Sequence, residues 1–139
     1  MPVTYGSNPP ASGMHYPFWG RWGEHVDALP RGNYVHNLEH GGVVLLYKCD
    51  TPCPEIVDAL KAVRDRAAAD PACEQQGRAG QKRIIITPSS TIPTKVAAAA
   101  WGATYTGDCV DGPTLDEFVA KKGQNGPENL CFAGQSVFQ

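Results

Sequence analysis

The sequence predicts an α/β domain with a small mixed sheet, in the order strand, helix, strand, strand, helix. Two short aliphatic runs, Val43–Tyr47 and residues 83–87, have the length and β-branched composition of buried strands. Between them, apolar residues recur at helical spacing from Pro54 to about Ala69, and residues 70–81 follow as a Gly-containing loop. A strand, a helix and a strand in this order usually form a parallel unit. We expect all 139 residues to form one domain.

Residues 1–33 are expected to form an ordered arm that wraps around the α/β core at residues 34–122. Proline and glycine are frequent in the arm, which excludes long helices and strands there. A disordered segment would be poor in aromatic residues. The arm instead contains five of them: Tyr5, Tyr16, Phe18, Trp19 and Trp22. Residues 123–139 are expected to form a tail.

Two further segments carry weaker signals. Residues 36–40 are expected to form a single helical turn, because Gly41 and Gly42 follow at once and end it. Residues 95–105 are ambiguous, since four alanines favour a helix whereas the β-branched and aromatic residues around them permit a strand. We favour a strand in the second half of that segment, antiparallel because the loop at residues 89–94 is short.

The last helix is expected to have Thr114 as its N-cap. Glu117, three residues later, would complete a capping box. Leu115, Phe118 and Val119 would then form the buried face of the helix.

The composition excludes some classes of partner and indicates a compartment. The formal net charge is −2 and no basic patch is present, so a nucleic-acid partner is not expected. No apolar run is long enough to cross a bilayer. Five cysteines in so short a chain indicate an oxidising, extracytoplasmic location, and we expect that an export signal or anchor has been removed.

Three of the four histidines point to a metal site. His36 and His40 are four residues apart, which places them on one face of a helical turn, about 5–6 Å apart at Cβ. His15 follows Met14 in a turn of the arm and can fold back towards them. Imidazole suits copper and zinc, and a thioether selects copper(I), so copper is the first choice and zinc the second. The fourth histidine, His25, is expected on the surface.

The same histidines permit other interpretations. They can simply cap the helix and form hydrogen bonds in a polar turn. His36 to His40 also matches H-x-x-E-H, the inverted zinc-peptidase motif, in which Glu39 would activate water. Glu117 and Glu128 are candidates for the third zinc ligand, although no spacing supports either. We favour a role for Glu39 in orienting a histidine ligand.

The cysteines suggest a second kind of chemistry. Cys49 and Cys53 lie in C-x-x-x-C-P between the first strand and the first helix, where a helix dipole stabilises a thiolate. This arrangement resembles thioredoxin-like redox proteins and the copper-chaperone branch of that fold; a small structural disulfide is the alternative. The strand between His40 and Cys49 separates the two sites by about 16 Å. A Cys73–Cys109 bridge is plausible, and Cys109–Cys131 is the alternative.

Five motifs together resemble one bacterial family. They are PPASGMH (residues 9–15), PRGNY (residues 30–34), VHNLEHG (residues 35–41), AWG (residues 100–102) and PE (residues 127–128). The family is catalogued as domain of unknown function 3105. The resemblance implies an exported or membrane-anchored protein, in the periplasm or at the cell surface, and no established activity.

The resemblance also assigns positions. It implies that His15, His36, His40 and Glu39 lie on family positions, whereas Met14 lies where members vary. It implies that the cysteines are an elaboration of some members. We therefore expect an extracytoplasmic metal-binding protein with a His-rich site. The alternatives are a zinc-dependent hydrolase, a thiol oxidoreductase and a module whose aromatic arm binds a protein partner.

Overall fold

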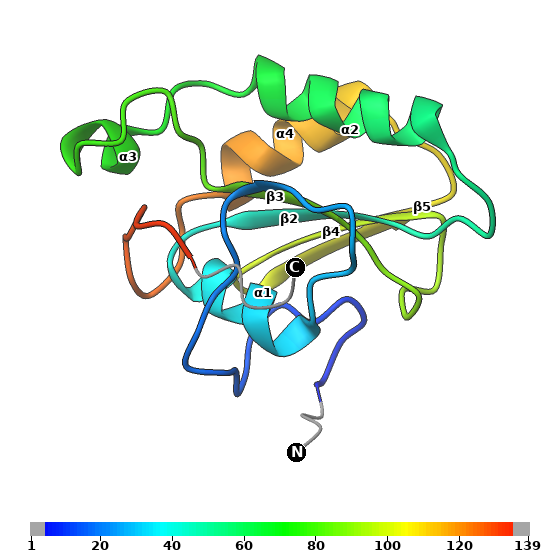
Figure 1. The fold of residues 1–139 in the computed structure, drawn as a ribbon, viewed down its shortest axis with the longest axis horizontal. Helices are drawn as coiled ribbons and strands as arrows, with labels where there is room; N and C mark the ends of the chain where they lie inside the picture. The colour runs from blue at the N-terminus through cyan, green and yellow to red at the C-terminus, as the bar shows by residue number, and fades with distance from the viewer. Residues whose placement is uncertain (1–4, 135–139) are drawn as a thin grey trace.

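A five-stranded mixed sheet lies between two helical layers in the computed structural model, which describes residues 5–134 (Figure 1). The strand order is β1-β3-β2-β4-β5. The strands are β1 (Gly23–Glu24), β2 (Val43–Tyr47), β3 (Ile84–Pro88), β4 (Val96–Ala100) and β5 (Ala103–Gly107). The helices are α1 (Arg31–Glu39), α2 (Pro54–Arg66), α3 (Pro71–Gln75) and α4 (Gly112–Lys122). This architecture confirms the predicted α/β class.

The strand directions agree with the sequence prediction. β2 and β3 are parallel and are joined through α2, whereas β4 runs antiparallel to β2. Side chains of a strand alternate between its two faces, and β2 shows this directly. Val44 and Leu46 pack in a cluster with α1, whereas Val43 and Leu45 pack in a cluster with α2 and α4. The sheet therefore buries both faces.

The ambiguous segment at residues 95–105 is a hairpin of two strands, β4 and β5. Its first half is as much a strand as its second, because alanines that favour a helix locally are fully buried on both faces of the sheet. Small side chains let both helical layers approach this strand closely. Gly102 turns the chain with a φ of +78°, a conformation that glycine adopts without steric cost.

Helix α1 is longer than the single turn expected at residues 36–40. It begins at Arg31 and has no side-chain N-cap, since Pro30 occupies that position. Gly32 weakens the helical signal but is needed for packing: a Cβ there would come within 2.5 Å of the Tyr16 ring. The arm therefore packs directly on α1, which fixes the position of the helix beneath the sheet (Figure 1).

Two smaller predictions about helices are wrong. The loop expected at residues 70–81 contains the short helix α3, whose N-cap is Asp70. The N-cap of α4 is Asp111, whose carboxylate accepts a hydrogen bond from the backbone N–H of Thr114. Glu117 pairs instead with Lys121, one turn further along the helix.

Two disulfides form, Cys49–Cys53 and Cys73–Cys131, and Cys109 is free and exposed. Both predicted partners of Cys109 are therefore wrong. The error arises because the segment at residues 95–105 forms two antiparallel strands, β4 and β5, where one strand was expected, so the chain reverses direction once more. β5 runs parallel to β2 and carries Cys109 to the end of the sheet where Cys49 lies, away from Cys73. Two disulfides indicate that the chain folds in an oxidising environment.

The segment after α4, residues 123–134, is laid across the C-terminal end of α1. Backbone N–H groups of Glu128 and Leu130 donate to the carbonyls of Glu39 and His40, at 2.9 and 3.2 Å. The disulfide to Cys73 holds the same segment from its other side. The predicted tail is thus an integral part of the fold as far as it is described.

No helix in the described part of the chain is long and apolar enough to cross a membrane.

Candidate metal centre

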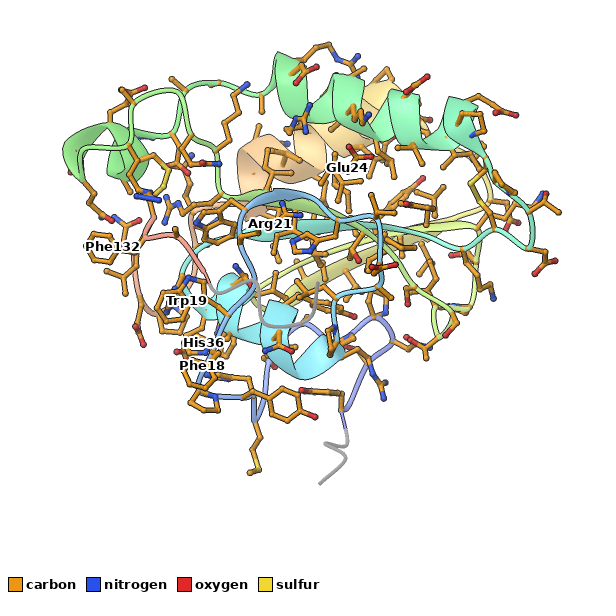
Figure 2. The ribbon with its side chains drawn as sticks, in the orientation of Figure 1. Phe18, Trp19, Arg21, Glu24, His36 and Phe132 are labelled. Carbon is orange, nitrogen blue, oxygen red and sulfur yellow. A yellow bond between two sulfur atoms is a disulfide. The ribbon has the colours of Figure 1, made fainter. Side chains whose placement is uncertain are left out.

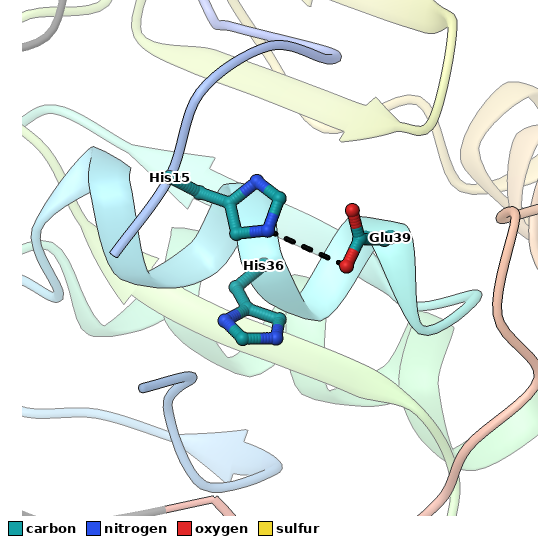
Figure 3. A group of neighbouring side chains, drawn as sticks. All are labelled: His15, His36 and Glu39. Carbon is teal, nitrogen blue, oxygen red and sulfur yellow. Dashed lines mark ion pairs between the residues drawn. The ribbon is translucent and has the colours of Figure 1, made fainter. Parts of the chain in front are cut away.

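The arm and α1 bring together His15, His36 and Glu39 (Figure 3). The ligand atoms of these three side chains all lie within 4.8 Å of one another. His15 comes from the arm, and its Nε2 lies 3.4 Å from Oε1 of Glu39. The His15 and His36 rings have centroids 4.5 Å apart. All three side chains are partly exposed, so an ion can reach them from solvent.

Backbone carbonyls fix the orientation of both imidazoles. Nδ1 of His15 is 2.9 Å from the carbonyl oxygen of Gly13, and Nδ1 of His36 is 2.7 Å from that of Tyr16. A neutral ring that donates through Nδ1 has a lone pair on Nε2. Metal-ligating histidines usually have this arrangement, because the outer hydrogen bond sets the tautomer and the ring orientation.

His40 belongs to a second group, together with Glu39 and Glu128. The ligand atoms of these three residues also lie within 4.8 Å of one another. Nε2 of His40 lies 3.6 Å from Oε1 of Glu128, which the segment after α4 places there. Glu39 is the member that the two groups share.

The His40 ring is buried, with a side chain only 2% exposed. Its Nδ1 has no hydrogen-bond partner within residues 5–134, which leaves a buried polar atom unsatisfied there. Burial and then the neighbouring His36 lower the pKa of His40 to about 4, although Glu128 acts in the opposite direction. The ring is therefore neutral near pH 7, the form in which an imidazole binds a metal.

The low pKa of His40 predicts that the metal-free protein loses stability in mild acid. The folded pKa of about 4 lies below the ordinary value of 6.5, so the unfolded chain takes up the proton first as the pH falls. We expect a loss of about 2–3 kcal/mol between pH 7 and pH 4 from this group, at 1.36 kcal/mol per pKa unit. Urea unfolding with a chelator present measures the free energy of unfolding at each pH. The loss should shrink in His40→Gln; an unchanged loss would contradict the assignment.

Trp19 forms one wall of the site. Its ring centroid lies 5.1 Å from that of His36 and 4.6 Å from that of His40. Its Nε1 donates to the carbonyl oxygen of Phe132, 3.1 Å away, so the indole joins α1 to the C-terminal segment (Figure 2). The sequence signal for this role was the aromatic content of the arm, which predicted packing but not a position beside the histidines.

The other candidate residues lie away from these groups. Met14 is 79% exposed, and only its backbone carbonyl is engaged, accepting from the Tyr5 hydroxyl. His25 is buried, with Nε2 2.9 Å from the carbonyl oxygen of Arg21, so its expected surface position is wrong. Cys49 and Cys53 follow β2 whereas His40 precedes it, so the disulfide and the histidines lie at opposite ends of that strand.

The three residues of the H-x-x-E-H motif are divided between two ligand groups among the described residues. In the zinc peptidases that have this motif, both histidines hold one ion and the glutamate activates water. Within the described chain, His36 and His40 fall into different ligand groups, and Glu39 belongs to both.

Comparison with known proteins identifies the family. The family described as Protein of unknown function (DUF3105) matches residues 1–132, nearly the whole chain. No curated protein and no solved structure matches this chain. The match includes both histidine motifs and Glu128, and it confirms the resemblance drawn from the motifs. The chain therefore belongs to the family of proteins of unknown function DUF3105.

Proposed function

We propose that this protein binds a divalent transition-metal ion through His15, His36 and Glu39. One observation carries the proposal: the arm delivers His15 to α1 with both Nδ1 atoms engaged by backbone carbonyls. One ring nitrogen of each imidazole and one oxygen of the carboxylate then lie within 4.8 Å of one another. Two imidazoles and one carboxylate are a common ligand set for borderline metal ions.

Copper(II) is the first choice for the ion and zinc the second. Divalent copper has the highest affinity in the first-row series for nitrogen and oxygen ligands, and imidazole suits both metals. The exposed thioether of Met14 gives no support to a copper(I) site with a methionine ligand. Because the set contains no thiolate or thioether, we propose binding of the divalent ion.

The proposed location is outside the bacterial cytoplasm, in the periplasm or at the cell surface. The two disulfides support an oxidising compartment. Copper handling fits that location, because the site is partly exposed and can accept an ion directly from solution or from a donor protein.

The test is metal binding by the whole chain, wild type beside His36→Ala. We expect the variant to lose affinity for Cu²⁺ by more than about 100-fold, since loss of an outer hydrogen-bond partner alone costs about 10–100-fold. Calorimetric titration and metal analysis after dialysis give the affinity and the content.

Met14→Leu is the matched control, because Met14 is next to His15 in the sequence and its side chain is exposed. It should bind like the wild type. Equal metal content in wild type and His36→Ala would sink the proposal, and a loss in Met14→Leu would restore the methionine ligand.

A further inference from the structure

We propose that the site holds a second metal ion, between His40 and Glu128, with Glu39 bridging the two ions. This inference rests on the proposed function, because the first ion at His15, His36 and Glu39 is half of the centre. The second ion is of the same class, a divalent transition metal held by one imidazole and two carboxylates.

The separations between ligand atoms are those that a shared ion produces. Two atoms that each lie about 2.1 Å from one ion, at a tetrahedral angle, are about 3.4 Å apart. The His15–Glu39 contact is 3.4 Å and the His40–Glu128 contact is 3.6 Å. Both exceed the usual 2.7–3.2 Å of a direct N–H···O hydrogen bond. Both distances leave room for an ion bound to the two atoms.

Glu39 is placed to serve both ions. It is the common member of the two ligand groups, and a carboxylate has two oxygens that can each bind a separate ion. The His36 and His40 rings, one from each ligand group, have centroids 4.6 Å apart. Two-ion centres in proteins hold their ions about 3.5–4 Å apart, a spacing that a bridging carboxylate spans.

The surroundings of His40 support a ligand role over a purely structural one. A buried histidine in a structural role usually has both nitrogens satisfied. Among the described residues, Nδ1 of His40 has no hydrogen-bond partner, and Nε2 lies 3.6 Å from Oε1 of Glu128, beyond the usual range of a direct hydrogen bond. His25, the other buried histidine, shows the contrast, because its Nε2 has a direct 2.9 Å contact with a backbone carbonyl.

Glu128 is held in place by backbone contacts. Its N–H donates to the Glu39 carbonyl, and its neighbour Asn129 accepts from Nη1 of Arg83 at 2.6 Å. Gly126 lies so close to the end of α1 that a Cβ there would overlap the Glu39 carbonyl oxygen. The carboxylate itself is 48% exposed, so its replacement should leave the fold intact.

The experiment counts Cu²⁺ ions per chain on the whole metal-free protein. We expect two ions in the wild type, one in Glu128→Gln and one in His15→Ala. Glu117→Gln, which changes an exposed glutamate on α4 that pairs with Lys121, is the matched control and should retain two. Spin counting by electron paramagnetic resonance is the second readout. Because the spins of a bridged pair of Cu²⁺ ions couple, the signal should rise while the first equivalent of Cu²⁺ is added and fall while the second is added.

Each result separates the two proposals. One ion in both wild type and Glu128→Gln overturns the second site and leaves the proposed function standing. Two ions that persist in Glu128→Gln, or two uncoupled ions in the wild type, also overturn the bridged centre. Binding of no ion by the wild type overturns the proposed function itself.

Discussion

Replacing Cys73 and Cys131 together with serine is expected to lower the free energy of unfolding by about 4 kcal/mol. The two cysteines are 58 residues apart. The bridge lowers the conformational entropy of the unfolded chain, and this loss of entropy increases with the logarithm of the loop length. Both side chains are fully buried, so the serines also place hydroxyls in an apolar setting. Urea unfolding followed by circular dichroism, on metal-free protein, measures the change.

The other disulfide provides the control. Cys49 and Cys53 are only 4 residues apart, so the same loop-entropy relation predicts a loss of about 2 kcal/mol when both become serine. The Cys73/Cys131 variant should also lose the second metal ion, because the bridge anchors the segment that carries Glu128. Equal losses of stability in the two variants would contradict the loop argument.

Asp70→Ala is expected to destabilise the protein by about 3–5 kcal/mol, the cost of leaving a buried charge without its partner. Asp70 and Arg83 form a two-pronged pair, with contacts of 2.7 and 2.9 Å, and their side chains are 5% and 2% exposed. Asp70 also caps α3 by accepting from the backbone N–H of Ala72. Thermal or urea unfolding measures the loss.

A second ion pair on the surface shows whether burial causes the effect. Arg66 and Asp116 form a similar pair, but their side chains are 50% and 39% exposed. Asp116→Ala should therefore cost no more than about 1 kcal/mol. The double variant Asp70→Leu/Arg83→Met should recover part of the loss, because it removes the unpaired charge. If Asp70→Ala costs as little as Asp116→Ala, the buried pair does not stabilise the fold.

The sequence predicted the parts of the fold in which the local pattern and the tertiary setting agree. β2 and β3 are aliphatic runs of strand length, and α2 has an apolar stripe at helical spacing. The four alanines of β4 were ambiguous, because their helix preference is local whereas the need for small side chains between two packed layers is set by the rest of the fold. The hairpin that follows was missed for the same reason.

The candidate site was predicted in part. The spacing of His36 and His40 and the turn at His15 indicated a histidine cluster, and the structure places these rings in contact. The division into two ligand groups depends on which way each ring points, and carbonyls of the arm orient the His15 and His36 rings. The position of Glu128 depends on Arg83 and on the Cys73–Cys131 bridge, and no local pattern encodes a pairing across 58 residues.

The C-terminal segment also determines when the site can exist. The proposed ligands come from residue 15, from residues 36–40 and from residue 128, so Glu128 is made long after the others. Chains are synthesised from the N-terminus, and elements can fold as they emerge. A nascent chain that has already formed α1 and β2 still lacks Glu128 and Cys131, whose disulfide to Cys73 anchors the segment that contains Glu128. We therefore expect loading with two ions only after residues 128–131 have been made and the Cys73–Cys131 bridge has formed, and we expect a chain truncated before Glu128 to hold one ion at most.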